Sequence, residues 1–266
     1  MAESRCDLNP AEGSRRFHQS GAEPTDPALA ASVDAYWMVD WQLPPGEPYV
    51  HESLPDPAIH LVLQAGQSRL VGVCTTRFTY TLDDTGRIFG ARFRPAGFHA
   101  YARVPASSCT DGVIPVEQLF GSAGRRVERE VLATDPGDGA AAVGIVEAFL
   151  RSVAQEPDRH VDLVQRVFDS IAADRSIRRV DHLVDRFHVS ARTLQRLFAT
   201  YIGVSPTWVI RRQRLIEAAD RVIGGRADDW AELAVELGYF DQAHLVNDFT
   251  TVVGRPPGAH AKLVGA

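Results

Sequence analysis

One short pattern occurs twice in the second half of the chain, and this repeat limits the possible folds more than any other feature. It reads SARTLQRLF at 190–198 and DQAHLVNDF at 241–249. Each copy starts with a good helix-capping residue and is followed within a few residues by a glycine and a proline. A short stretch with helical spacing precedes each copy, at Arg179–Phe187 and at Trp230–Leu237. Two short helices joined by a tight turn form a helix-turn-helix unit, so the repeat predicts two such units in tandem.

A longer helix is predicted between the two units. It runs from Pro206 to Ile223 and ends at two glycines. Its 18 residues, at about 1.5 Å each, give a spacer of about 27 Å. Successive major grooves on one face of DNA lie about 34 Å apart. With the widths of the flanking helices added, this spacer could place the second helix of each unit in neighbouring grooves.

Charge is distributed unevenly along the chain. The formal net charge is −6, but residues 175–226 hold 11 arginines against 4 acidic residues. Residues 227–266 hold 2 basic residues against 6 acidic ones. Charges are screened beyond about 8 Å in physiological salt, so a local basic segment matters more to nucleic acid than the whole-chain sum. The first unit is therefore favoured as the DNA partner, with a solvated arginine-rich helix face as the alternative.

The first half of the chain has a different pattern. Residues 1–31 are rich in Pro, Gly, Ala and Glu without a period, and we expect a loose N-terminal arm. Runs of β-branched and aromatic residues then predict short strands, at 33–41, 59–63, 69–74, 76–82 and 88–93. Helical spacing follows at 123–133 and 140–154, and Glu-Pro-Asp at 156–158 interrupts it.

These patterns predict an α+β protein of two domains. The first is a β-rich, barrel-like regulatory or sensor domain at 32–155 that ends in helices. The second is an all-α domain at 160–266 with two helix-turn-helix units. The helix at 140–154 carries an apolar stripe that we expect to pack on its own domain, with a homodimer contact as the alternative. The stripe consists of Val143, Val146, Phe149, Leu150 and Val153.

Several locations and protein classes are disfavoured. No apolar run reaches the roughly 18 residues that span a bilayer, so we expect no membrane segment. The first residues lack the apolar region of a signal peptide. The cysteines Cys6, Cys74 and Cys109 form neither a CxxC pair nor a disulfide framework, which is typical of a protein in the reducing cytoplasm.

The repeated region resembles a known family. From about 166 to 262 the chain is similar to the DNA-binding domain of AraC/XylS transcriptional regulators, through SARTLQRLF, GVSPT, the arginine-bearing linker helix and LGYFDQAHLVNDF. Residues 33–121 resemble the uncharacterised sensor-like domain that precedes this module in many bacterial, especially actinobacterial, regulators. The segments AYWMVDWQLPP, HLVL, FGARFRPAGF and VIPVEQLFG carry that likeness.

The resemblance implies a double-stranded DNA operator as partner, and it assigns roles to residues of the first unit. Arg192, Gln195 and Arg196 lie on one helical face and would read bases. Ser190 and Thr193 would donate to phosphates, and Ser190 would also cap the helix. The remaining expected contacts are Gln242, Ala243 and Asn247 in the second unit and Arg211 and Arg212 in the linker helix. RNA polymerase and a second copy of the chain are further expected partners.

An unknown small-molecule effector is expected in the N-terminal domain. The aromatic residues Trp37, Trp41 and Tyr80 could line a chamber for an apolar or aromatic ligand, or they could be core. Arg92 and Arg94 could bind an anionic ligand, or they could be charges at a strand edge.

Two chemical alternatives concern the same domain. A metal site of the cupin kind could use His51, His60 and His99, but these histidines lack the expected HxH spacing. A thiol-based sensor could use a cysteine, although no motif surrounds any of the three. Glycine-rich phosphate loops are absent, and we expect no cofactor and no enzymatic activity.

Overall fold

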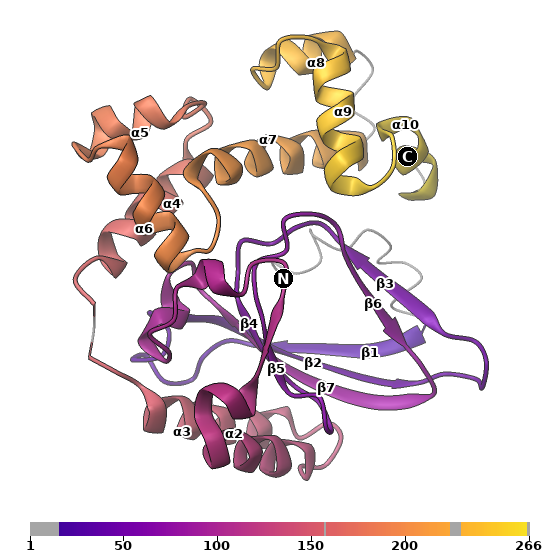
Figure 1. Cartoon of the computed structure of the whole chain (residues 1–266). Coiled ribbons are helices and arrows are strands. Elements are labelled where there is room, and N and C mark those ends of the chain that lie inside the picture. Colours follow the sequence, from indigo (N-terminus) through magenta and orange to yellow (C-terminus); the bar gives the residue numbers. More distant parts are fainter. Residues whose placement is uncertain (1–15, 157, 224–229, 265–266) are drawn as a thin grey trace.

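The chain folds into a sheet-rich N-terminal half and a helical C-terminal half. This computed structural model describes residues 16–156, 158–223 and 230–264. In Figure 1 the sheets lie below the long helix α7 (Pro206–Ile223), and α7 connects two separate groups of short helices. The α+β fold class expected from the sequence is confirmed.

Among the described residues, eight strands form two antiparallel sheets in the N-terminal half. They are β1 (Phe17–Ala22), β2 (Val33–Gln42), β3 (Tyr49–Ser53), β4 (His60–Leu63), β5 (Arg69–Val71), β6 (Phe78–Leu82), β7 (Thr85–Phe93) and β8 (Val113–Pro115). Six of them form one sheet in the order β1-β2-β7-β4-β5-β8, and β3 pairs with β6 in a small second sheet. The strand predicted at 76–82 is therefore present as β6, although it pairs with β3 rather than with its chain neighbour β7.

The prediction of a loose arm at 1–31 is wrong for its described part. Phe17–Ala22 is an edge strand, with Phe17 opposite Trp41 and Ala22 opposite Tyr36. The following turn is held by Glu147 of the helix at Gly139–Val153, which accepts a hydrogen bond from the Thr25 amide at 2.7 Å. Pairing with β2 satisfies the backbone donors and acceptors of this segment, and such pairing needs no apolar period. The composition of the segment therefore does not indicate a strand. Residues 1–15 of the expected arm lie outside the described residues.

Two helices cover one side of the large sheet, as Figure 1 shows: α2 (Val116–Leu132) and α3 (Gly139–Val153). Most of the apolar stripe on α3 is buried in the main core, including Val146 and Leu150 at 0% exposure. The stripe therefore packs on its own domain, as the simpler interpretation expected. A homodimer through this stripe is contradicted because the side chains are already covered.

The C-terminal half consists of helices, and those predicted at 179–187, 206–223 and 230–237 agree closely with the observed bounds. The helices are α4 (Val161–Ala173), α5 (Val180–Phe187), α6 (Ala191–Tyr201), α7 (Pro206–Ile223), α8 (Trp230–Glu236), α9 (Gln242–Val253) and α10 (Pro257–Val264). We refer to α4–α6 as the first unit and to α8–α10 as the second unit. The helix α7 coincides with the predicted spacer.

Apolar packing crosses between the two halves. The main core extends from the sheet into the first unit, where it includes Leu194 and Phe198 of α6. The short 3-10 helices at Gly97–Ala100 and Ala106–Ser108 contact α6, and the Thr110 hydroxyl donates to the Gly203 carbonyl at 2.7 Å. The second unit has a separate core, to which the N-terminal half contributes Leu54.

Candidate nucleic-acid interface

The turn of the first unit has the geometry that its sequence predicts. Helix α5 ends at Phe187, and His188 then adopts a left-handed conformation with φ of 54°. Ser190 begins α6, where its hydroxyl accepts a hydrogen bond from the Thr193 amide at 3.2 Å. A capped, separate second helix is therefore presented directly after a tight turn.

The predicted base-reading residues of α6 lie together on its exposed face. Leu194 and Phe198 on the opposite face are buried in the main core. Arg192, Gln195 and Arg196 are exposed, and none of them makes a described hydrogen bond or ion pair. The helical spacing places their side chains on one surface. This surface is available to a partner.

The phosphate-contact candidates stand at the start of the same helix. The Ser190 and Thr193 hydroxyl oxygens are 2.9 Å apart, so one hydroxyl donates to the other. The proton of the accepting hydroxyl remains available. The unpaired amides of the first helical turn and the helix dipole favour an anion at this end.

The second unit repeats this plan with different side chains. Asp241 caps α9 by accepting from the His244 amide at 2.8 Å. Gln242, Ala243 and Asn247 are exposed on α9, as expected. Phe240 is 90% exposed in the turn before the helix, and it is not among the predicted contact residues. An apolar residue just before a helix cap usually packs on the first turn of the helix, so the local pattern does not indicate this exposure.

The linker arginines are engaged within the protein. Arg211 donates from Nε to Asp248 of α9 at 2.6 Å, with a second contact through Nη2, so Asp248 attaches α9 to the linker helix. Arg212 points to the N-terminal domain, where it donates to the Pro55 carbonyl and lies 3.8 Å from Asp56. Its side chain is only 13% exposed. Arg212 therefore does not present a free guanidinium to DNA in this conformation, contrary to expectation.

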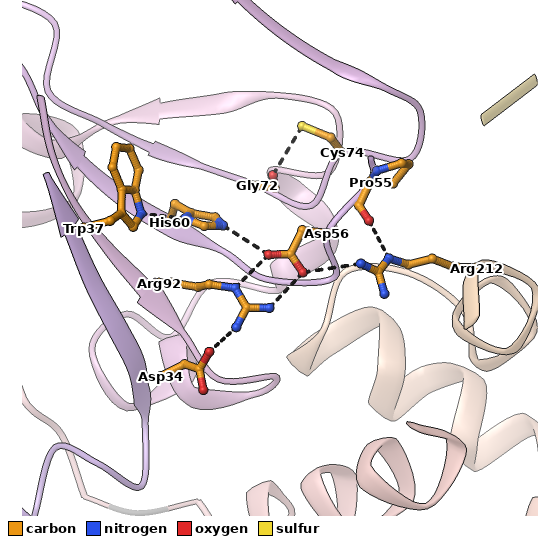
Figure 2. Close-up of polar contacts among 9 residues, drawn as sticks. All are labelled: Asp34, Trp37, Pro55, Asp56, His60, Gly72, Cys74, Arg92 and Arg212. Atoms are coloured by element: carbon orange, nitrogen blue, oxygen red, sulfur yellow. Dashed lines mark hydrogen bonds and ion pairs between the residues drawn. The ribbon is translucent and has the colours of Figure 1, made fainter. Parts of the chain in front are cut away.

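Asp56 is the centre of the polar cluster drawn in Figure 2. Arg92 holds its two oxygens at 2.7 and 2.9 Å and also pairs with Asp34. Burial alone would raise the pKa of Asp56, but hydrogen bonds from His60 and Arg92 and the charges of Arg92 and Arg212 lower it well below its ordinary value. Asp56 is therefore a carboxylate shared by the two domains.

One predicted effector residue reaches this cluster through a histidine. The Trp37 indole Nε1 donates to His60 Nδ1 at 3.3 Å, and His60 Nε2 lies 3.5 Å from Asp56. The cluster therefore joins Trp37 and Arg92 of the N-terminal domain to Arg212 of α7. No local pattern marks Asp56, because its arginine partners lie far away along the chain.

The other predicted effector residues do not gather with these two. Trp41 is buried and donates to the Asp83 carbonyl at 2.9 Å. The Tyr80 hydroxyl donates to Gln64 at 2.9 Å, and Arg94 donates to the Ala30 carbonyl at 2.7 Å. An open depression of about 820 Å³ lies beside Trp41, and Arg16, His18 and Arg87 are among its lining residues. Trp41 is the one predicted effector residue that lines it.

The residues of the metal and thiol alternatives are separated in space. His60 contacts Asp56, whereas the His99 ring packs 4.6 Å from that of Tyr201. Within the described ranges, no three His, Cys, Asp or Glu side chains are grouped to hold a metal ion. Burial raises the pKa of the Cys74 and Cys109 thiols, which disfavours the reactive thiolate. Cys6 lies outside the described residues.

No helix in the described part of the chain is both long enough and apolar enough to cross a lipid bilayer.

Comparison with known proteins gives family matches for both halves. A family model described as a domain of unknown function (DUF6597) matches residues 23–115, and a helix-turn-helix domain model matches residues 183–262. A comparison with curated proteins gives no match.

Among solved structures the fold is distantly similar to ToxT from Vibrio cholerae. One ToxT structure has 10% sequence identity and a TM-score of 0.42, covering 94% of this chain and 100% of that chain. ToxT bound to a methylnaphthalenyl butenoic acid has 10% identity and a TM-score of 0.40, with 94% and 99% covered. ToxT bound to an unsaturated fatty acid has 9% identity and a TM-score of 0.39, with 93% and 94% covered.

The matched helix-turn-helix model spans both repeats, the linker helix and the exposed face of α6. Residues 183–262 therefore carry an AraC-type helix-turn-helix domain, and a domain of unknown function precedes it at residues 23–115.

Proposed function

We propose that this chain is a sequence-specific, effector-responsive transcriptional regulator, which acts by binding double-stranded DNA rather than by catalysis. The exposed face of α6 carries the proposal, because Arg192, Gln195 and Arg196 have no described intramolecular hydrogen bond or ion pair there. In the major groove, arginine pairs with guanine O6 and N7, and glutamine pairs with adenine N6 and N7. Helix α6 is therefore the main reading helix of the proposal.

The remaining contacts follow from position and charge. Ser190 and Thr193 lie where the start of α6 would meet a phosphate, and they would position the helix without specifying bases. In the second unit Gln242, Ala243 and Asn247 would add selectivity from α9. The acidic balance of residues 227–266 makes this unit the weaker partner of a phosphate backbone.

The N-terminal domain would regulate DNA binding through its contacts with α7 and the second unit. Arg212 is held by Asp56 and the Pro55 carbonyl, Leu54 is buried in the core of the second unit, and Arg255 pairs with Glu52. These contacts keep a linker arginine away from DNA. The conformation described here is therefore proposed as the restrained state.

The effector in this proposal is a small molecule that acts on the Asp56 cluster. Trp37 and Arg92 are its best-placed contacts, since both are joined to Asp56 directly or through His60 (Figure 2). A ligand that draws Arg92 away changes the charge balance around Asp56 and so its hold on Arg212. Trp41, Tyr80 and Arg94 are more distant candidates because they do not contact this cluster.

Protein partners belong to the same proposal. RNA polymerase is the expected partner of a transcriptional regulator, and the exposed Val235 and Phe240 offer apolar surface in the second unit. A homodimer would need a surface other than the buried stripe of α3.

The experiment that tests the proposal is a selection of random double-stranded DNA with the full-length protein. We expect one family of sequences to be enriched, with an affinity that falls at least about a hundredfold between roughly 50 and 200 mM salt. If neither the wild type nor Asp56→Asn enriches any sequence, the chain is not a sequence-specific DNA-binding protein.

The variant Asp56→Asn tests the restraint on the same DNA. It removes the charge that holds Arg212, and we expect about fivefold or more tighter binding. Asp40→Asn is the matched control, because Asp40 pairs with Arg87 inside the N-terminal domain. Equal affinities of Asp56→Asn and Asp40→Asn would exclude the restraint while leaving DNA binding intact.

A further inference from the structure

The two helix-turn-helix units have separate apolar cores, and α7 contributes to both. Val209 and Ile210 of α7 belong to the core that contains the first unit. Leu215, Ala218 and Ala219 of α7 belong to the core of the second unit. The described apolar clusters therefore do not join one unit directly to the other, and the angle between them depends on α7, on the N-terminal segment around Leu54 and on polar contacts.

An arginine in the loop between α4 and α5 reaches across to the second unit. Arg178 donates from Nη2 to the Glu236 carbonyl at 2.8 Å. Glu236 is the last residue of α8, where a carbonyl has no partner further along its own helix. A cation at this end also interacts favourably with the helix dipole. Arg178 thus caps a helix that belongs to the other unit.

The close fit continues at the turn after α8. Gly238 has φ of +76°, and a Cβ at this position would lie 3.1 Å from Cδ of Arg178 and 3.2 Å from its Nη1. The arginine side chain therefore lies directly against the turn that leads into α9. A shift of either unit would break this contact.

The linker helix contacts the backbone of the same arginine. Arg214 of α7 donates to the Arg178 carbonyl, and its guanidinium lies 5.9 Å from the ring centre of Tyr239 in the second unit. Arg178, Arg214 and Glu236 therefore connect the first unit, the linker helix and the second unit. We call these three residues the inter-unit bridge.

A parallel series of ion pairs reinforces the bridge. Arg175 lies 2.9 Å from Glu217 of α7, and Glu217 lies 3.1 Å from Arg221. Arg221 in turn pairs with the Glu236 side chain. The loop of the first unit is thus tied to the end of α8 by a second route.

We propose that Arg178 is a positioning residue that fixes the distance and rotation between α6 and α9. The protein would therefore select operators by the number of base pairs between the DNA element bound by α6 and the DNA element bound by α9. The inference rests on the proposed function. One added base pair moves the second element by about 3.4 Å along the DNA and about 35° around it. A rigidly bridged pair of helices cannot follow that change without losing contacts, whereas a pair without the Arg178 contacts can adjust more easily.

The test uses the best DNA from the selection and a second duplex with one base pair inserted between the two protected elements. For the full-length wild type we expect the insertion to weaken binding by about tenfold or more, a loss comparable to that from a mismatched base pair. For Arg178→Ala we expect the ratio of the dissociation constants, with the inserted base pair and without it, to fall below about threefold. The ratio is informative because loss of an ordinary phosphate contact weakens both duplexes equally.

Arg179→Ala is the matched control, since it removes the same charge from the next position of the loop, and it should keep the wild-type ratio. Arg178→Lys should restore part of the selectivity, because an ammonium group can still donate to the Glu236 carbonyl. An unchanged ratio in Arg178→Ala would overturn the inference while the proposed function stands. Absence of any DNA binding by the wild type would overturn both.

Discussion

The two helix-turn-helix units place different side chains at matching positions of their second helices. Arg192 and Arg196 of α6 are exposed without described partners, whereas the matching positions of α9 are Ala243 and Asn247. The buried acid of α9, Asp248, instead holds Arg211 of the linker helix. One unit therefore offers its charges to a partner, and the other uses charge to attach itself to α7. Repetition of a motif does not by itself predict equal roles.

The units also differ in how they are supported. The core of the first unit is continuous with the sheet domain, while the second unit has a smaller core of its own. The second unit is consequently the part of the helical half that can loosen independently. The predictions below test this difference first and the difference in charge afterwards.

The largest effect is expected from removing an aromatic side chain in the core of the second unit. Phe249 is fully buried there, and Phe249→Ala should lower the free energy of unfolding of that unit by about 3–5 kcal/mol. Hydrogen exchange should show lost protection in α8–α10 with α6 unchanged. Phe198→Ala, at the matching position of the first unit, should instead spread its effect into the sheet domain. Identical exchange patterns for the two variants would show that the cores are not independent.

A smaller effect is expected on DNA binding. Arg196→Ala should weaken binding to the selected DNA by about 1–3 kcal/mol and relax the preference at one base pair. Asn247→Ala, at the matching position of α9, should cost less than Arg196→Ala, because the acidic second unit is the weaker partner of DNA. Competition titrations with single-base variants of the DNA measure both. A larger loss from Asn247→Ala would reverse the order of the two units.

The smallest effect concerns acid sensitivity of the second unit. His260 is fully buried, and burial together with the charge of Arg255 lowers its pKa from the ordinary value of 6.5. As pH falls below about 6.5, the unfolded chain binds a proton that the folded chain resists, so stability falls by at most about 1.4 kcal/mol per pH unit. Exchange in α8–α10 at pH 7.5 and 5.5 should show this loss, and His260→Phe should reduce it. His244→Gln, at an exposed position, should not, and acid sensitivity that survives His260→Phe would assign it to another group.

Much of the helical half and the exposed face of α6 could be predicted from the sequence. The bounds of α7, the caps Ser190 and Asp241 and the exposed face of α6 all depend on neighbours within a few residues. Helical period, capping chemistry and turn residues express such short-range interactions directly. The missed edge strand at Phe17–Ala22 shows the limit, because its stability comes from pairing with β2 and not from its own pattern.

The sequence by itself therefore determined which residues form the two units and which face of α6 is polar. Only the tertiary structure decided that Arg212 is held by the N-terminal domain, that Leu54 completes the core of the second unit and that Arg178 caps α8. Arg212 and Pro55 are 157 positions apart, and Arg178 and Glu236 are 58 apart. Contacts over such separations depend on how whole elements pack, and no local period or motif encodes them.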